Sequence, residues 1–214
     1  MSALAVQSGF FDLGPQQLAH DGQGGIRYLP GIVDAAQATE WFELLRERVA
    51  WQAMRRPMYD RVVDVPRLVC AYRLEDPAVP APIGEIAARV RAELGEPFNT
   101  VGLNHYRDGR DSVAPHNDKL HTLVPGHPIA LLSLGSTRCM TIRAKAAPRT
   151  AIRIELAPGS LLVMSYDSQL HYDHGIPKTR GKVPPRMSLA FRVRPVGAPS
   201  RSTDRILQPA SPPD

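Results

Sequence analysis

The stretch that decides the fold runs from Asn104 to Asp118 and reads N-H-Y-R-D-G-R-D-S-V-A-P-H-N-D. Asn104 and Tyr106 are two positions apart, which is the spacing of side chains on one face of a β-strand. The D-G pair that follows is a strong signal for a hairpin turn. His116 and Asp118 repeat the same spacing, so the sequence predicts an imidazole and a carboxylate side by side on a second strand.

This His and Asp pair suits a divalent first-row metal, and one further His would complete the 2-His-1-carboxylate triad of non-haem Fe(II) sites. The motif is short: 7 His and 21 acidic residues among 214 predict about 0.7 such pairs by chance, and a second pair occurs at residues 171–173. The third ligand is therefore sought downstream, where His174 follows a predicted turn and buried strand and His171 is the alternative. Asp111 is an alternative carboxylate, but its place in the turn favours a bracing role.

A later strand carries two arginines on one face. Residues 186–192 read R-M-S-L-A-F-R, so polar and small residues alternate with Met187, Leu189 and Phe191. An arginine on the inside of a barrel is costly unless an anion pairs with it. We therefore expect an anion to bind against the face that carries Arg186 and Arg192.

Together, the array N-x-Y-x-D-G-x-D-x4-H-x-D, a distal His and R-x5-R resembles the AlkB family of Fe(II)/2-oxoglutarate-dependent dioxygenases, over about residues 60–194. The resemblance implies bound Fe(II), 2-oxoglutarate as cosubstrate and O2. It implies the following site residues: His116, Asp118 and His174 as iron ligands, Asn104 and Arg192 at the 1-carboxylate of 2-oxoglutarate, and Tyr106 and Arg186 at its 5-carboxylate, which a guanidinium can grip with two hydrogen bonds. Ser188 is a further contact and stands where family members often have Asn.

The expected fold is mainly β with flanking helices (α+β), around a double-stranded β-helix or jelly roll, because short strands broken by Pro and Gly follow a helical start. The predicted helices span 33–49, with Asp34 as the cap, and 83–94, ended by Gly95. The predicted strands span 101–106, 129–134, 140–143, 152–156, 160–165 and 187–193. One domain is expected, with an irregular arm over 1–27, helical support over 28–98, the catalytic core over 99–194 and a disordered tail over 195–214.

Composition is that of a globular enzyme, with 43% hydrophobic residues in 214. No apolar run approaches the ~18 residues of a membrane helix, and the first residues lack the basic start of a signal peptide. Cys70 and Cys139 lack C-x-x-C spacing and are expected to be free, buried thiols. We therefore expect a cytoplasmic monomer that does not bind membranes.

The charge distribution predicts an anionic partner. The net charge is +5, and basic residues cluster in three places: Arg138–Arg153, the 178–182 loop with Lys178, Arg180 and Lys182, and a segment with Arg55, Arg56, Arg61 and Arg67 near Met58 and Tyr59. Basic side chains interleaved with aromatics fit a phosphate backbone and a stacked base. With the resemblance, this predicts DNA or RNA carrying N-alkylated bases as the substrate, reached in a single strand or after flipping.

One position departs from the family pattern. Leu120 stands two residues beyond the predicted ligand Asp118, where family members often have an acid, and Leu cannot accept a hydrogen bond from a base. Two alternatives therefore stay open. The chain is an oxygenase of a protein, lipid or small molecule, or it is a non-catalytic jelly-roll binding module.

Overall fold

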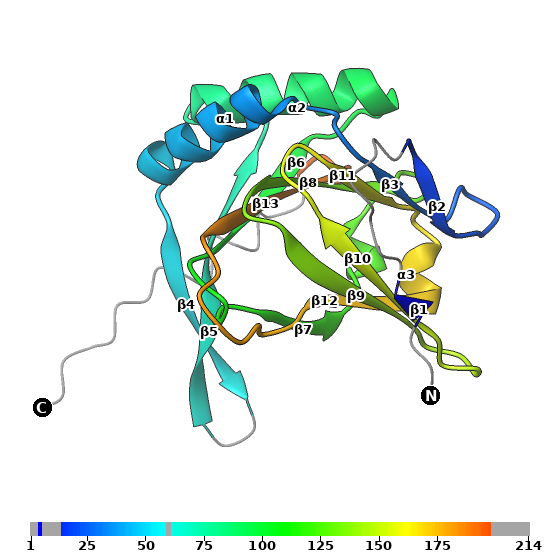
Figure 1. Cartoon of the computed structure of the whole chain (residues 1–214). Coiled ribbons are helices and arrows are strands. Elements are labelled where there is room, and N and C mark those ends of the chain that lie inside the picture. Colours follow the sequence, from blue (N-terminus) through cyan, green and yellow to red (C-terminus); the bar gives the residue numbers. More distant parts are fainter. Residues whose placement is uncertain (1–3, 6–13, 59–60, 198–214) are drawn as a thin grey trace, which may run out of the picture.

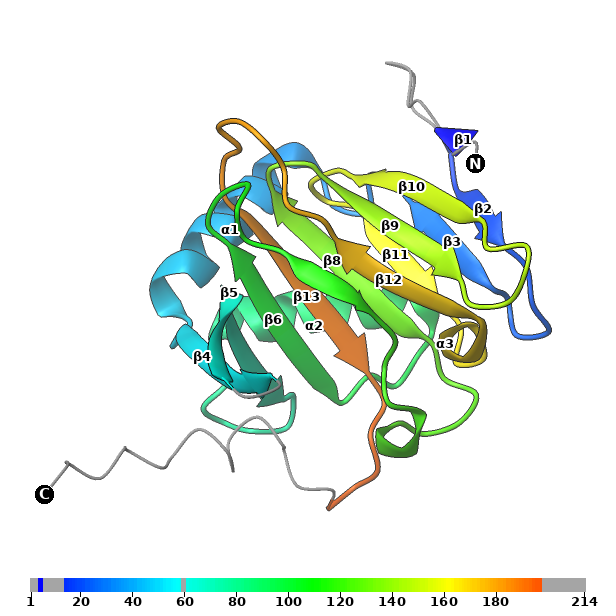
Figure 2. The ribbon, with the colours of Figure 1, turned by 90° about the horizontal axis from the view of Figure 1, so that it is seen from below.

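The computed structural model describes residues 4–5, 14–58 and 61–197, which form two facing β-sheets with two helices against the larger one (Figure 1). The strand order of the larger sheet is β2-β3-β11-β8-β13-β6-β5-β4, and that of the smaller sheet is β1-β10-β9-β12-β7. Seen from below, the smaller sheet lies across the larger one, with β9 and β12 in front of β8 and β13 (Figure 2). This is the predicted jelly roll.

The larger sheet is antiparallel, and β13 (Arg186–Arg192) lies between β6 (Thr100–Tyr106) and β8 (Ile129–Gly135). The remaining strands of this sheet are β2 (Gln16–Ala19), β3 (Ile26–Leu29), β4 (Gln52–Met58), β5 (Arg61–Arg73) and β11 (Leu161–Met164). The smaller sheet contains β1 (Leu4–Ala5), β7 (Val113–His116), β9 (Arg138–Ala144), β10 (Ala151–Leu156) and β12 (Tyr172–Ile176). Two short helical turns, η1 (Leu120–Thr122) and α3 (Ser168–His171), lie in connections.

Two hydrophobic cores lie on the two faces of the larger sheet. Met187, Leu189 and Phe191 of β13 pack in the core beneath the helices, whereas Ala190 packs in the core between the sheets. The alternation predicted for this strand is therefore confirmed. It leaves Arg186, Ser188 and Arg192 on the face that looks into the space between the sheets.

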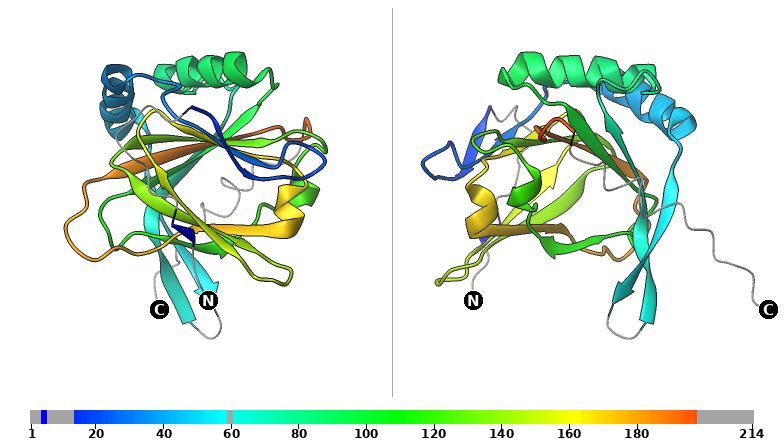
Figure 3. Two further views of the ribbon diagram at one scale, coloured as in Figure 1. Left: turned by 45° about the vertical axis from the view of Figure 1, so that its right-hand side comes forward. Right: turned by 180° about the vertical axis from the view of Figure 1, so that it is seen from behind.

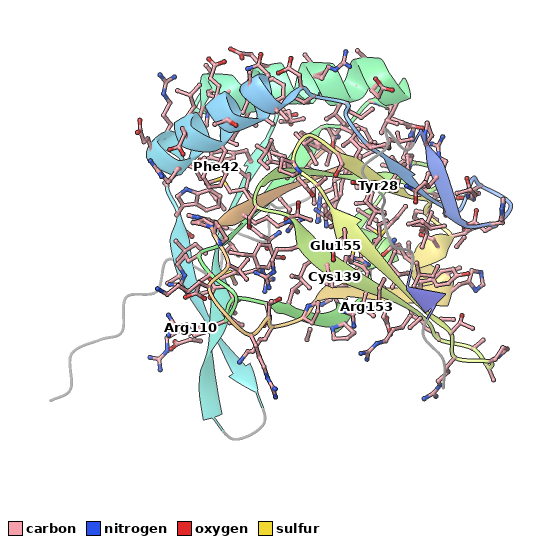
Figure 4. All side chains as sticks on the ribbon, in the orientation of Figure 1. Tyr28, Phe42, Arg110, Cys139, Arg153 and Glu155 are labelled. Atoms are coloured by element: carbon pink, nitrogen blue, oxygen red, sulfur yellow. The ribbon has the colours of Figure 1, made fainter. Side chains whose placement is uncertain are left out.

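The two long helices, α1 (Ala35–Arg48) and α2 (Ala81–Leu94), cover the outer face of the larger sheet (Figure 3). Asp34 caps α1 as predicted by accepting a hydrogen bond from the Gln37 N–H at 2.9 Å, and Gly95 ends α2 in the left-handed conformation. Phe42 is buried between α1 and the sheet (Figure 4). Trp41, Phe42 and Leu45 of α1 are buried, whereas Leu44 is only partly covered.

The predicted boundaries hold for the core strands and fail nearer the N-terminus. The arm expected to be irregular over 1–27 contains β2 and the start of β3, which form a hairpin that extends the larger sheet through β11. The segment expected to be helical over 28–98 also contains β4 and β5, which project as a long hairpin (Figure 1). Of the predicted tail, residues 198–214 lie outside the described residues. Cys70 and Cys139 are free as predicted, but both are half-buried instead of buried.

No helix in the described part of the chain is long and apolar enough to cross a membrane.

Candidate active site

Two histidines from neighbouring strands meet in the smaller sheet. His116 of β7 is the cross-strand partner of His174 of β12, and their ring centroids are 4.5 Å apart. The His116 Nδ1 donates to the Ala114 carbonyl at 3.0 Å, which leaves Nε2 pointing away from this hydrogen bond. His171, the alternative ligand, ends α3 with an exposed side chain. The structure thus brings His174, and not His171, beside His116.

Burial controls the charge of the inner histidine. His174 is only 5% exposed, and burial together with the neighbouring His116 lowers its pKa to about 3 despite the nearby Asp118 carboxylate. The imidazole of His174 is therefore neutral at ordinary pH, which is the form that binds metals.

Asp118 follows β7 and lies between this histidine pair and the larger sheet. The expectation that it shares a strand with His116 is wrong, because β7 ends at His116. Its carboxylate accepts from Arg192 Nε at 2.7 Å and from Nη2 at 3.0 Å. Burial alone would raise the pKa of Asp118, but the guanidinium of Arg192 outweighs it and holds the pKa at about 2.

As they stand, no three His, Cys, Asp or Glu side chains in the described ranges are grouped to hold a metal ion. The donor chemistry nevertheless fits iron, since two imidazoles and one ionised carboxylate make up a 2-His-1-carboxylate set. An ionised carboxylate has about four acceptor positions, so Asp118 can keep Arg192 and still offer an oxygen to a metal. His116, Asp118 and His174 remain the predicted iron ligands.

A buried guanidinium lies deeper in the space between the sheets. Arg186 is fully buried, and its Nη2 donates to Ser133 Oγ at 2.9 Å while Nε and Nη1 have no partner. The side chain lies over the ring of Tyr106, 5.3 Å from its centroid. Burial lowers the pKa of Arg186 to about 10, so the group still carries its charge at neutral pH. A buried cation with two free donors suits an anion such as a carboxylate, and the place of Arg186 at the 5-carboxylate of 2-oxoglutarate stays a prediction.

The other predicted cosubstrate residues lie on the same two strands, β6 and β13. Ser188 is the cross-strand partner of Asn104, and Asn104 Nδ2 donates to Ser188 Oγ at 3.4 Å. Arg192 lies further along β13, against Asp118. The structure therefore orders the predicted cosubstrate groups along two adjacent strands, from Arg186 and Tyr106 at one end to Arg192 at the other.

Several residues that support the site were assigned either another role by the sequence, as for Lys145 and Arg67, or no role, as for Gln169. Gln169 of α3 accepts from the Asp118 N–H at 2.9 Å. Lys145 Nζ donates to Asn117 Oδ1 at 2.9 Å and to the Gln169 carbonyl at 2.7 Å. Arg67 Nε donates to Asn104 Oδ1 at 2.6 Å. Only their positions next to motif residues in space reveal these roles, and sequence spacing carries no such signal.

These contacts correct the predicted basic clusters. Lys145 is held beside the site, and Arg138 is 3% exposed, so of the five basic residues in 138–153 only Arg143, Arg149 and Arg153 are exposed. Arg67 is engaged with Asn104 instead of lying on an open face. In the 178–182 loop, Lys178, Arg180 and Lys182 are exposed as expected, and Arg55 is exposed in an ion pair with Asp64 at 3.1 Å. Tyr59 lies outside the described residues.

Two remaining positions have defined places. Asp111 is 4% exposed and forms an ion pair with Arg107 at 2.8 Å, so it braces the turn as predicted and lies apart from the histidines' ligand set. Leu120 begins η1, half-buried, and packs against the core between the sheets.

The jelly roll with its paired histidines, carboxylate and buried anion cradle defines the class of non-haem iron oxygenases that use a carboxylate cosubstrate. The sequence profile of the 2OG-Fe(II) oxygenase superfamily matches residues 25–194. The chain belongs to this superfamily and, within it, to the AlkB homologues. Membership implies Fe(II) and 2-oxoglutarate.

Two individual proteins and one solved structure are similar to the chain. The chain is 30% identical over 205 residues to the alpha-ketoglutarate-dependent dioxygenase alkB homolog 3 of Mus musculus, covering 85% of this chain and 71% of that protein. It is 36% identical over 124 residues to the DNA oxidative demethylase ALKBH2 of Homo sapiens, covering 53% of this chain and 48% of that protein. The chain thus spans about half the length of the ALKBH2 proteins it matches. The solved structure of OsALKBH1 shares the fold, with a TM-score of 0.56, 16% identity, and coverage of 78% of this chain and 97% of that one.

Proposed function

We propose that the chain is an Fe(II)/2-oxoglutarate-dependent dioxygenase that oxidatively dealkylates N-alkylated bases in nucleic acid, with DNA as the first substrate to test. The use of 2-oxoglutarate as cosubstrate is supported above all by Arg186, a buried cation with two unpaired nitrogens. The nucleic-acid half is supported by the similarity to ALKBH2, whose name is DNA oxidative demethylase. It is also supported by the exposed Arg143, Arg149 and Arg153 on the β9–β10 hairpin.

In the proposed reaction, the residues of the site bind and orient the cosubstrate or set the charge of the predicted metal ligands. Arg186 and Tyr106 would hold the distal carboxylate, which fixes the cosubstrate along β13 and β6. Arg192 keeps Asp118 ionised, and burial keeps His174 neutral, so both are ready to bind the metal. When bound, iron and 2-oxoglutarate, with O2 as the oxidant, would supply the oxidation of the substrate C–H bond: one oxygen atom goes to the substrate and the other to succinate, and CO2 is released. The hydroxylated N-alkyl group then leaves as an aldehyde and restores the base.

The test is succinate formation by the protein with Fe(II), 2-oxoglutarate and N-methylated oligonucleotides, with unmodified oligonucleotides of the same sequence as control. Methylated DNA should increase succinate formation above the unmodified level and release formaldehyde. A parallel RNA panel decides between the two nucleic acids. Turnover that is equal on methylated and unmodified strands would refute the demethylase. It would favour an oxygenase of a protein, lipid or small molecule.

Strand binding has its own test. Replacing Arg143 and Arg149 by Gln should reduce the slope of log affinity against log salt by about 0.7 to 0.9 for each phosphate that these side chains neutralise. The matched control is the double exchange of Arg46 and Arg48 by Gln on α1, which lies on the far face of the larger sheet (Figure 1). An equal change in both double variants would show that the hairpin does not bind phosphates specifically. Lys145 is left unchanged because it supports the site.

We further propose that the protein is a monomer in a reducing cytoplasm, in line with its two free thiols. Analytical ultracentrifugation tests the monomer.

A further inference from the structure

A second arginine points into the space between the sheets from the side opposite Arg186. Along β9, Arg138, Met140 and Ile142 are buried and alternate with more exposed residues, and Met140 and Ile142 belong to the core between the sheets. Arg138 therefore shares the inward face of the smaller sheet. It is 3% exposed and reaches Tyr106 of the larger sheet, with its guanidinium carbon 5.8 Å from the ring centroid.

The guanidinium of Arg138 ties together the loops at this end of the barrel. Nη1 donates to the Asp108 carbonyl at 3.0 Å, and Nη2 donates to the carbonyls of Asp111 and Pro177 at 3.0 and 2.9 Å. The first two carbonyls belong to the turn between β6 and β7, and the third follows β12. One side chain thus fixes both loops and the ring between them.

The contacts of Arg138 satisfy hydrogen bonds but leave its charge without a counter-ion. All three acceptors are neutral carbonyls, and its Nε has no partner. Asp111, the acid whose charge acts most strongly on Arg138, gives both its oxygens to Arg107. In the described ranges, neither Arg138 nor Arg186 forms an ion pair, and the positive charge of Arg138 is felt at Arg186. The Tyr106 ring therefore has two buried cations close to its centroid, at 5.8 and 5.3 Å, an arrangement that a protein interior tolerates poorly without an anion.

We propose that Arg138 is a positioning residue of the cosubstrate site that supplies its second positive charge, and that it makes the site select 2-oxo acids with a distal carboxylate. Arg186 offers the free hydrogen-bond donors, while Arg138 holds Tyr106 in place and adds long-range attraction for the same carboxylate. The inference rests on the cosubstrate half of the proposed function and is independent of the nucleic acid.

The experiment compares two ligands that share the 2-oxo acid head and differ in the distal carboxylate. Binding of 2-oxoglutarate and of 2-oxobutyrate is measured by calorimetry and by competition, on the full chain with Mn(II) in place of iron, so that no turnover is needed. Arg138→Met should weaken 2-oxoglutarate binding by about tenfold or more, the scale of one charge interacting across several ångströms of protein. Its binding of 2-oxobutyrate should change by less than about threefold.

Two further variants keep the inference falsifiable. Arg138→Lys preserves the charge and should retain more of the preference for 2-oxoglutarate than Arg138→Met, even though it cannot hold all three carbonyls as well. Arg48→Met removes an exposed positive charge from α1, on the far side of the larger sheet, and should change neither affinity. An equal loss for both ligands in Arg138→Met would overturn the inference, since it would assign Arg138 to loop structure alone. Unchanged binding of both ligands would overturn it too. A protein that binds 2-oxoglutarate as expected but fails on methylated oligonucleotides would leave the inference standing and refute only the substrate.

Discussion

Arg186→Met separates the stability of the fold from the binding of the cosubstrate. The exchange removes a fully buried guanidinium and replaces it with an apolar side chain that fits the same interior. Burial lowers the pKa of Arg186 to about 10, which corresponds to a cost of about 3 kcal/mol for holding its charge inside the protein. Against this stands the hydrogen bond to Ser133 Oγ, and a bond from a charged donor contributes about 1.5–3 kcal/mol.

These opposing contributions nearly cancel, so the free energy of unfolding without cosubstrate should stay within about 1.5 kcal/mol of the parent protein. With 2-oxoglutarate at about 100 times its dissociation constant, the parent gains about 2.7 kcal/mol. For a chain of this size, that gain raises the melting temperature by about 5 to 10 °C. Arg186→Met should lose this shift, because both free nitrogens that would bind the carboxylate are gone.

The assay is thermal and urea unfolding of the Mn(II)-loaded protein, with and without 2-oxoglutarate. Arg186→Lys keeps the charge without the planar fork and should bind about 1–3 kcal/mol more weakly than the parent. Arg153→Met, the same exchange at an exposed position, should behave like the parent in both conditions. A loss of several kcal/mol in Arg186→Met without cosubstrate would show that Arg186 already has an internal partner. A full shift with 2-oxoglutarate would show that the anion binds elsewhere.

Three further predictions concern other parts of the molecule. Burial lowers the pKa of His105, which packs against the rings of Phe42 and Trp51, so the stability that the neutral His105 contributes is fully present above about pH 6.5 and is lost as the pH falls below that value. His105→Leu should therefore flatten the dependence of the free energy of unfolding on pH between about pH 5 and 7, measured in urea, and an unchanged dependence on pH would contradict this. Gln169→Ala removes the acceptor of the Asp118 N–H and should weaken Mn(II) binding by about 10- to 100-fold in a fluorescence titration, whereas Leu170→Ala, at a 55% exposed neighbour, should not. Gly159→Ala should lower the free energy of unfolding by about 2 kcal/mol or more, because φ is +77° and the added Cβ would lie 2.1 Å from the Val33 carbonyl oxygen; equal denaturation midpoints would refute this.

The elements that the sequence predicted well are those in which local pattern and tertiary packing agree. The alternation in 186–192 survives in β13 because one face meets the helices and the other meets the interior. Helix α1 begins after Asp34 and α2 ends at Gly95 because caps act within a few residues.

The missed strands lack such a local signal. The β2–β3 hairpin is short and rich in glutamine, and its turn is held by the Asp21 carboxylate, which accepts from the N–H groups of Gln23 and Gly25. The strands β4 and β5 pair mainly with each other and with β6. Cross-strand pairing of this kind depends on partners distant in sequence, so no window of the chain reveals it.

The placement of the candidate site residues in space was predictable where they form a motif and unpredictable where they support one. The motif predicted that His116 and His174 lie close together, and in the structure they are cross-strand partners. It gave no information on Arg138, Lys145 or Arg67, which the sequence showed only as positive charges. Whether an arginine serves the surface or the interior depends on the strand face it occupies, and for Arg138 that face is decided by the β9–β10 register.

The strand β7 ends the smaller sheet and, among the residues that the structure describes, pairs only with β12, with a shift in register beyond His174. Its last residue, His116, is exposed, while the His174 opposite is buried. Fraying of one edge strand would therefore detach one predicted ligand while the barrel, its cores and the cosubstrate cradle stay folded. Metal exchange should accordingly proceed by local opening of β7. Its rate should depend on the free energy of that opening and not on substitutions that destabilise the helical side of the molecule.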